Sequence, residues 1–380
     1  MKISVIFGTR PEIIKLSPVI RALQQKKLNF FIIHTNQHYN KNMDEIFLKE
    51  LALPKAKYNL NIGSGTHGNM TGRMLIEVEK IFFKEKPDLL IVQGDTNTVL
   101  AVSLAASKLG IKIAHVEAGL RSYTKIPEET NRILTDRISD FLFAPTEKQN
   151  KILQNEGIEK EKIFVVGNTI VDAVIQNLKL ASHFKSRTGF ETRAFESAAL
   201  KPIKPKKYLL ATAHREENVD NKTKLENILN AIEKSAKKHN LKAIYPIHPR
   251  TEKRIKEFKI KKPKNIKFIK PVGYLDMLLL MKNAKIILTD SGGIQEEACI
   301  LHVPCVTMRE ATERPETVEV GGNIIAGTDA QKIIKCVDLM LKKKVNWNTP
   351  LSGAKSLFSS PFGSGNSGKL IMEILKMSLT

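Results

Sequence analysis

The chain has 380 residues, of which 42% are hydrophobic and 26% are charged. This length exceeds that of one ordinary domain and suits two domains, each with its own core. Lys and Arg number 61 against 39 Asp and Glu, and the formal net charge of +22 favours anionic ligands, unless it reflects only a lysine-rich solvated surface. The densest basic run, 259–270, has few aromatic residues, so we predict no nucleic-acid partner.

The three cysteines, Cys299, Cys305 and Cys336, form no CxxC pair. An odd number of scattered cysteines is typical of reduced thiols in a cytoplasmic protein and not of a disulfide framework or a zinc site. The apolar run at the N-terminus is too short for a signal peptide, and no run of about 18 apolar residues is present. We therefore predict a cytoplasmic protein with no membrane span.

The first half of the chain alternates short apolar runs with helix-periodic segments. The predicted strands are 3–7, 29–35, 88–95 and 111–119, and the predicted helices are 11–26, 68–86 and 98–110. Continuous apolar strands separated by helices are typical of a parallel sheet that is covered on both faces.

The second half repeats this rhythm. The predicted strands are 207–215, 242–249, 265–271, 285–293 and 304–308, and the predicted helices are 222–239, 274–284 and 294–302. The stretch 184–207 lacks clear periodicity, so we place the domain change between residues 170 and 205. Two α/β units in tandem predict two Rossmann-like domains with parallel sheets facing a cleft, and ligands of such sheets bind beyond the carboxyl ends of the strands.

The first such strand end is GTRPEIIKLSP, residues 8–18. Gly8 allows a tight turn, and Arg10 and Lys15 place two cations at the start of a helix, where anions bind well. A capped helix with surface charges would give the same pattern. The motif is not GxGxxG, so it does not imply a dinucleotide cofactor.

Carboxylates lie at the ends of the third and fourth predicted strands. Asp95 ends one strand in QGDTNTVLA, Glu117 ends the next in HVEAGLRS, and Glu128 follows in PEETNR. Asp95 would also serve as a plain helix cap, and Arg121 and Arg132 would turn the acids into a structural ion-pair network. The alternative is an acid/base set, in which neighbouring carboxylates differ in protonation and move a proton between the two faces of a carbon.

Basic residues end strands in the second half. His214 in TAHREEN would bind phosphate or protonate a leaving oxygen, unless it is a structural histidine. The motif HPRT adds His248 and Arg250 by the same argument, with less support.

The segment TDSGGIQEEA combines a strand end with a glycine-rich helix start. The backbone N–H groups of Ser291, Gly292 and Gly293 suit a diphosphate, and Glu297 would accept both hydroxyls of a ribose. A turn-capped helix without a ligand is the other interpretation. The neighbouring loop 309–323 contains Arg314. Neither metal-ligand spacing nor a nucleophile motif is found, so no metal is predicted.

A series of motifs now becomes recognisable in order: GTRPE, QGDTNTVLA, HVEAGLRS, PEETNR, GNTIVDA, TAHREEN, TDSGGIQEEA and TERPETVEVG. From residue 1 to about 375 the chain resembles the non-hydrolysing UDP-N-acetylglucosamine 2-epimerases. This resemblance implies a GT-B-type fold with an N-terminal domain of residues 1–170, a UDP-binding domain of residues 171–364, and a C-terminal helix, 365–380, that crosses back to the N-terminal domain. It also implies a homodimer, domain closure around the substrate and no cofactor.

The implied reaction interconverts UDP-GlcNAc and UDP-ManNAc. UDP leaves C1 by anti elimination as the C2 proton is removed, and it adds back to the 2-acetamidoglucal intermediate. Carried over by motif, Asp95, Glu117 and Glu128 perform the proton chemistry, and His214 lies near the diphosphate. The residues implied for substrate binding are Arg10, Lys15 and Ser291 to Gly293 at the phosphates, Glu297 at the ribose, and Arg314 on the phosphate side.

Two departures from the family pattern concern ligand choice. Many bacterial members have QHRQ or QHRE at an activating second site, where this chain has QHYN. Gln37 is kept, Asn40 is changed, and Arg73 would be a partner of such an allosteric site. Separately, THGNMTGRM and KPVGYLDM resemble epimerases of UDP-2,3-diacetamido-glucuronic acid, whereas TERPETVEVG favours plain GlcNAc. A GT-B glycosyltransferase, a hydrolysing relative and a non-catalytic nucleotide-sugar sensor remain the other candidate functions.

Overall fold

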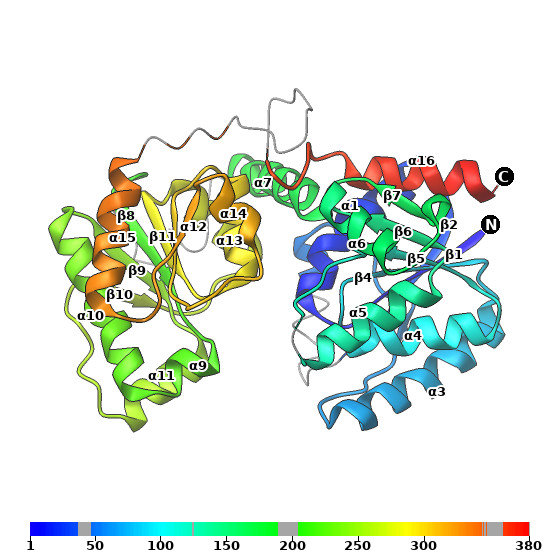
Figure 1. Cartoon of the computed structure of the whole chain (residues 1–380), viewed down its shortest axis with the longest axis horizontal. Helices are drawn as coiled ribbons and strands as arrows, with labels where there is room; N and C mark the ends of the chain where they lie inside the picture. The colour runs from blue at the N-terminus through cyan, green and yellow to red at the C-terminus, as the bar shows by residue number, and fades with distance from the viewer. Residues whose placement is uncertain are drawn as a thin grey trace. The chain divides into compact units, whose positions relative to one another are not determined.

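The chain forms two compact units, Met1–Ala173 with Phe362–Thr380, and Val174–Pro361. The computed structural model describes residues 1–36, 47–123, 125–188, 204–343, 345, 347 and 360–379. Figure 1 shows that each unit is a sheet with helices on both faces. Both are Rossmann-like, so the predicted fold class is confirmed.

Unit 1 contains a parallel sheet of seven strands in the order β3-β2-β1-β4-β5-β6-β7. The strands are β1(Lys2–Phe7), β2(Asn29–His34), β3(Tyr58–Asn59), β4(Leu89–Gln93), β5(Lys112–Val116), β6(Phe141–Ala144) and β7(Ile163–Val165). β4 is buried along its whole length, which explains its continuous apolar run. The chain leaves β1 toward β2 on one side and returns to β4 on the other, so the sheet has its topological switch point between β1 and β4.

Three helices of unit 1 lie where the periodicity predicts them, over 11–26, 68–86 and 98–110. The helices of this unit are α1(Arg10–Gln25), α3(His67–Glu85), α4(Asn97–Lys108), α5(Pro127–Ile138), α6(Glu147–Asn155), the 3-10 helix η1(Lys160–Lys162) and α16(Ser367–Leu379). The helix α7(Thr169–Thr188) begins in unit 1 and continues into unit 2. α3 and α4 pack on one face of the sheet around Val78, Val99 and Val92. Of the described residues, no helix is long and apolar enough to cross a membrane.

Unit 2 repeats the arrangement with six parallel strands in the order β10-β9-β8-β11-β12-β13. The strands are β8(Tyr208–Thr212), β9(Lys242–Pro246), β10(Ile266–Ile269), β11(Ile286–Thr289), β12(Cys305–Thr307) and β13(Asn323–Ile325). The helices are α9(Glu216–Val219), α10(Lys222–Lys238), α11(Pro249–Glu257), α12(Tyr274–Asn283), α13(Gly292–Ile300), α14(Pro315–Glu319) and α15(Ala330–Lys342). Side chains of β8 alternate between two cores, Leu209 and Ala211 with α10 and α15, and Tyr208 and Leu210 with α12 and α13. The switch point here lies between β8 and β11.

The C-terminal helix α16 packs on α1 of unit 1 (Figure 1). Gly368 permits this contact, because a Cβ at this position would lie 2.9 Å from the carbonyl carbon of Pro18. The first turn of α16 is tied to α7, since Asp172 accepts hydrogen bonds from the backbone N–H groups of Ser367, at 3.1 Å, and of Gly368, at 3.0 Å. The helix that ends the chain is therefore part of the first unit, as the fold prediction stated.

Candidate active site

Glu117 lies directly after β5, at the carboxyl edge of the unit 1 sheet. Its φ of 68° is in the left-handed region, which is uncommon for a residue with a side chain. The turn is held because the N–H groups of Glu117 and Ala118 both donate to the carbonyl oxygen of Phe143, at 3.1 and 3.2 Å. The residue is only 6% exposed, so its carboxylate requires partners inside the protein.

Lys15 from α1 is the main partner of Glu117. Its Nζ lies 2.7 Å from both carboxylate oxygens, and both side chains are buried, 11% and 3% exposed. Gln93 donates to the same carboxylate, and Asn168 donates at 3.4 Å. This ion pair favours the ionised form of Glu117. The predicted contact of Lys15 with phosphate stays a prediction, because its ammonium group is engaged by Glu117 in this structure.

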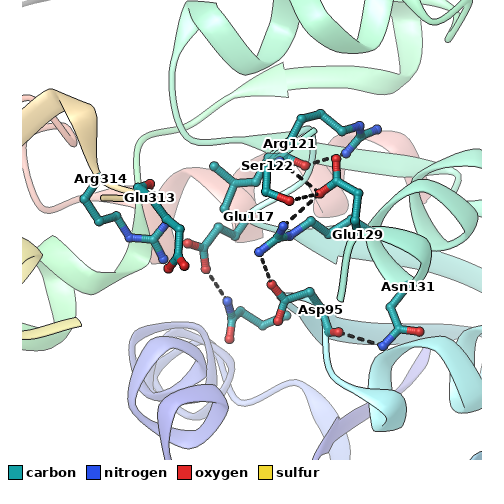
Figure 2. A network of polar contacts seen from close by, with 12 residues as sticks. Asp95, Glu117, Arg121, Ser122, Glu129, Asn131, Glu313 and Arg314 are labelled. Atoms are coloured by element: carbon teal, nitrogen blue, oxygen red, sulfur yellow. Dashed lines mark hydrogen bonds and ion pairs between the residues drawn. The ribbon is translucent and has the colours of Figure 1, made fainter. Parts of the chain in front are cut away.

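Asp95 lies at the neighbouring strand end, after β4, and its side chain is 28% exposed. The Arg132 guanidinium from α5 donates to its carboxylate at 2.5 Å, and Asn131 donates to its backbone oxygen at 2.9 Å, as Figure 2 shows. Arg132 also contacts Glu129 at 2.9 Å. β4 and β5 therefore place two carboxylates with separate cationic partners at one sheet edge.

The two glutamates of α5 have different surroundings. Glu128, the predicted acid/base residue, is exposed in the first turn, and its role stays a prediction. Glu129 is buried and accepts hydrogen bonds from the N–H and hydroxyl of Ser122, both at 2.9 Å, and from the N–H of Tyr123 at 3.1 Å. Burial raises the pKa of Glu129, but the hydrogen bonds from Ser122, Arg132 and Tyr123 outweigh it and the pKa is lowered. Glu129 therefore orders the segment before α5 as an ionised acceptor.

Glu12, which the motif analysis did not single out, occupies the turn between β1 and α1. Its Oε2 accepts from the N–H of Gly8 at 3.1 Å, and from the N–H and hydroxyl of Thr9 at 2.8 and 2.7 Å. Its Oε1 accepts from the Thr96 hydroxyl at 3.0 Å. The donors that suggested an anion site at the start of α1 are thus satisfied by the chain's own carboxyl group. The Thr-x-x-Glu spacing of a capping box was the available signal.

The position of Arg10 is consistent with this arrangement. Arg10 is exposed at the first position of α1, and its guanidinium carbon lies 5.8 Å from the ring centroid of Phe47. Its predicted contact with a phosphate stays a prediction.

Glu12 predicts a specific pH dependence of stability. Burial raises its pKa from 4.5 to about 7, against the hydrogen bonds from Thr9, Thr96 and Gly8. The folded chain therefore binds this proton more tightly than the unfolded chain, and the group's effect on stability becomes less favourable as the pH rises from 4.5 to about 7. Glu12→Gln keeps the shape of the side chain but does not titrate. Between pH 5 and pH 8 the free energy of unfolding of the native protein should therefore fall by about 2 kcal/mol relative to that of Glu12→Gln.

Urea unfolding of both proteins at the two pH values measures this difference. The matched control is Glu159→Gln, because Glu159 is 68% exposed and pairs only at the surface with Lys162. If the free energies of unfolding of the native protein and Glu12→Gln differ by the same amount at pH 5 and pH 8, Glu12 does not retain its proton in the folded state.

Asp290 organises the corresponding edge of unit 2. It follows β11 and is fully buried. Its carboxylate accepts from the N–H groups of His214 and Arg215, both at 2.9 Å, and from the Asn218 side chain at 3.2 Å. These bonds tie the segment between β8 and α9 to the end of β11, so that His214 is presented at the switch point of the sheet.

The structure brings His214 and His248 together, with ring centroids 5.4 Å apart. The His214 side chain is 38% exposed, and its Nδ1 lies 3.4 Å from Asp290. Burial, followed by the positive charges of His214 and Arg250, lowers the pKa of His248. Arg250 itself is held by Asp220 and Glu216. A partly exposed imidazole beside a buried carboxylate suits hydrogen bonding to an anion.

Ser291 caps α13, and Gly292 and Gly293 form its first turn. A Cβ on Gly293 would meet nothing within 4 Å, and one on Gly292 would approach only Glu313, at 3.6 Å. Packing does not demand glycine here, and the lack of side chains leaves the N–H groups of the helix start open to close approach by a ligand. Glu297 lies buried in the next turn of the same helix.

Arg314 lies in the loop before α14. Its Nε lies 3.0 Å from Glu296 of α13, and its side chain is 17% exposed. Gln295 holds the same loop, because its Oε1 accepts from the Thr312 hydroxyl at 2.6 Å and from Asn323 at 3.2 Å. Sequence reasoning did not identify Glu296 or Gln295 as the residues that attach this loop to α13.

Of the three predicted allosteric residues, the structure describes only Arg73. Gln37 and Asn40 lie outside the described residues, and Arg73 is exposed on α3. Among the residues that the structure describes, no group of three or more His, Cys, Asp and Glu side chains is arranged to hold a metal ion.

Comparison with known proteins identifies close relatives. The family model described as UDP-N-acetylglucosamine 2-epimerase matches residues 21–376. A UDP-N-acetylglucosamine 2-epimerase of Methanocaldococcus jannaschii is 58% identical over 99% of both chains. The crystal structure of that species' UDP-GlcNAc 2-epimerase in complex with UDP-GlcNAc and UDP matches with a TM-score of 0.84 and 57% identity, covering 99% of this chain and 100% of the other. A Pseudomonas aeruginosa UDP-2,3-diacetamido-2,3-dideoxy-D-glucuronate 2-epimerase is 42% identical over 93% of this chain and 96% of its own length.

Proposed function

Because the chain belongs to the UDP-N-acetylglucosamine 2-epimerase family, we propose that it interconverts UDP-GlcNAc and UDP-ManNAc. The observation that carries this proposal is the pair of carboxylates at adjacent strand ends of unit 1. Glu117 is buried and ion-paired with Lys15, and Asp95 is ion-paired with Arg132. Inversion at C2 needs one group that removes a proton and another that returns it to the opposite face.

Unit 1 supplies the proton transfer in this proposal. The ionised Glu117 can accept a proton because it is a carboxylate, and the ion pair with Lys15 keeps it in this proton-accepting form. Asp95 is partly exposed and has its own cationic partner, which makes it a second proton-transfer group. Glu128, exposed on α5, is proposed as a third contributor.

Unit 2 supplies UDP binding. The N–H groups of Ser291, Gly292 and Gly293 at the start of α13 suit the diphosphate. His214 would donate a hydrogen bond to the departing phosphate oxygen, and Arg314 would add positive charge on that side. Glu297 would accept the ribose hydroxyls, and Arg10 and Lys15 are proposed as further phosphate contacts.

The reaction is then an elimination followed by an addition. The base removes the C2 proton, the electron pair forms the C1–C2 double bond, and the C1–O bond breaks with its electrons leaving on UDP. Reversal on the other face of the 2-acetamidoglucal gives the C2 epimer. The sequence of steps is redox-neutral, so none of them needs an electron acceptor.

Two further properties are proposed from the family resemblance. We propose that the protein is a homodimer, which light scattering of the purified protein tests, and that it acts in the cytoplasm. The three cysteines are free, in keeping with a reducing compartment.

Product analysis tests the proposed activity. The protein is incubated with UDP-GlcNAc, and the products are identified by ¹H and ³¹P NMR. Formation of UDP-ManNAc, with return of UDP-GlcNAc when UDP-ManNAc is the starting material, is the expected result. Release of free ManNAc and UDP would indicate hydrolysis, and conversion of UDP-2,3-diacetamido-glucuronate in place of UDP-GlcNAc would indicate the activity named for the Pseudomonas relative.

A further inference from the structure

A buried histidine contacts the residue that precedes Asp95. His115 of β5 is 1% exposed, and both of its ring nitrogens contact acceptors. Nδ1 lies 2.7 Å from Asp136 of α5, and Nε2 lies 2.8 Å from the backbone carbonyl oxygen of Gly94. A carbonyl oxygen can only accept a hydrogen bond, so Nε2 must carry a proton.

The second nitrogen carries a proton as well, because the Asp136 oxygen that it faces belongs to a carboxyl group paired with an arginine. Its other oxygen, Oδ2, lies 2.8 Å from the Arg121 guanidinium and accepts from the N–H of Gly119 at 3.2 Å. A guanidinium is always charged and has donors only, so both oxygens of Asp136 are left to accept. His115 is therefore a doubly protonated, positively charged imidazolium.

The charges around His115 support this state. The groups that face it are Asp136 from α5 and Asp95 after β4, with Arg121 on the far side of Asp136 and Glu156 paired with Arg121. Burial lowers the pKa of His115, but the hydrogen bond and charge of Asp136, the Gly94 carbonyl and the charge of Asp95 outweigh it and raise the pKa above the ordinary value of 6.5. Cations and anions alternate through this buried cluster.

The histidine controls the peptide that carries Asp95. Gly94 has a φ of 82°, a left-handed conformation that glycine adopts without strain, and its N–H donates to Val116 at 3.1 Å. Its carbonyl is held by His115, and the carbonyl of Asp95 is held by Asn131 at 2.9 Å. The peptide groups on both sides of Asp95 are thus anchored to β5 or α5.

We propose that His115 is a positioning residue for the epimerase reaction, an imidazolium that fixes the Gly94–Asp95 peptide and places positive charge behind the Asp95 carboxylate. This inference rests on the proposed function of Asp95 in proton transfer. His115 itself does not touch the substrate and acts through Gly94.

Two substitutions separate the two contacts of His115. The amide of His115→Asn reaches Asp136 but not Gly94, whereas the longer His115→Gln can still donate to the Gly94 carbonyl without a charge. If positioning matters, His115→Asn should lower kcat by about 100-fold and His115→Gln by about 10-fold, because small displacements of reacting groups have effects of this size. KM for UDP-GlcNAc should change by less than about threefold, since the hydrogen-bond partners of His115, Asp136 and Gly94, are not among the residues assigned to UDP binding.

The control is His239→Asn, which breaks a similar His–Asp pair at the surface of unit 2, where Nε2 of His239 lies 2.8 Å from Asp338. This variant should keep wild-type kcat. Circular dichroism confirms that each variant is folded before its kinetics are compared. A folded His115→Asn with wild-type kcat would overturn the positioning role.

A measurement on the wild-type protein tests the charge of His115 independently of kinetics. Long-range ¹H–¹⁵N NMR, with the His115 signals assigned by their loss in His115→Gln, should show both ring nitrogens protonated at pH 7. A neutral ring at pH 7 would overturn the proposal. If the wild-type protein converts no UDP-GlcNAc, the proposed function fails, while the NMR result still decides the charge state of His115.

Discussion

Replacing Glu117 by Gln should abolish measurable exchange of the C2 proton of UDP-GlcNAc. The amide cannot take up a proton, and general acid–base groups contribute roughly 100- to 10,000-fold to a rate. The substitution should also lower stability by about 3 to 5 kcal/mol, because it leaves the buried Lys15 ammonium without its counter-charge. Deuterium incorporation at C2 in D₂O measures the first effect, and urea unfolding measures the second.

A double variant separates these two effects. Lys15→Met combined with Glu117→Gln removes both charges, so stability should recover most of the loss while exchange stays absent. Glu159→Gln is the matched control for the chemical change, since this glutamate is 68% exposed. A folded Glu117→Gln protein that exchanges the C2 proton at the wild-type rate would remove Glu117 from proton transfer.

The second large effect is expected at Asp290. Asp290→Asn keeps the size of the side chain but removes its negative charge and replaces one of its two oxygens by an NH₂ group. The N–H groups of His214 and Arg215 and the Asn218 side chain all donate to Oδ2 of the native carboxylate. If the amide oxygen takes the Oδ2 position, the NH₂ group faces the N–H of His214, which lies 3.2 Å from Oδ1. The remaining bonds then lose the charge of their acceptor, so unfolding should become easier by about 3 kcal/mol. Turnover should fall as well, because the segment that presents His214 is no longer held to β11.

The control for Asp290 is the same change at Asp329. That residue is exposed and caps α15, with its Oδ1 2.8 Å from the N–H of Lys332. Asn is as good a helix cap as Asp, so Asp329→Asn should change stability by less than about 0.5 kcal/mol. Equal stabilities of Asp290→Asn and the native protein in urea would show that the turn before α9 does not depend on the charge of Asp290.

The fold was predictable where hydrophobic pattern alone decides it. Buried runs such as 88–95 and 285–293 identified central parallel strands, although the structure ends them at Gln93 and Thr289. Both strands end early because the backbone turns there, at Gly94 with its positive φ and at Asp290, whose carboxylate holds another segment. Strand ends of this kind depend on tertiary contacts and not on local apolar content.

Several elements of unit 1 were not predicted. The segment Pro127–Ile138 was interpreted as a cluster of acids, whereas it forms the helix α5. Proline at its first turn followed by two glutamates is a helix-start signal, but its mean polarity is high and only one narrow side of it is buried. The short strands Phe141–Ala144 and Ile163–Val165 are also too brief to stand out by periodicity.

In the candidate site, too, the position of the strand ends was predictable and the tertiary contacts were not. Strand ends of a parallel sheet meet at one edge, so the neighbourhood of Asp95 and Glu117 followed from topology. Their partners did not follow, because Lys15 is 102 residues from Glu117 in the chain, and no spacing rule distinguishes Arg132 from Arg121 as the partner of Asp95. His115 lies within an apolar strand, and the sequence does not show that both of its ring nitrogens face acceptors, Asp136 and the Gly94 carbonyl.

The most direct test of the account is the fate of the C2 proton in the wild-type protein. UDP-GlcNAc is incubated with the enzyme in D₂O, and the isotope at C2 of each product is determined by ¹H NMR. If two carboxylates act on opposite faces of C2, every UDP-ManNAc molecule should carry deuterium at C2, and the UDP-GlcNAc pool should acquire it as equilibrium is approached. UDP-ManNAc that retains the original proton at C2 would contradict the account.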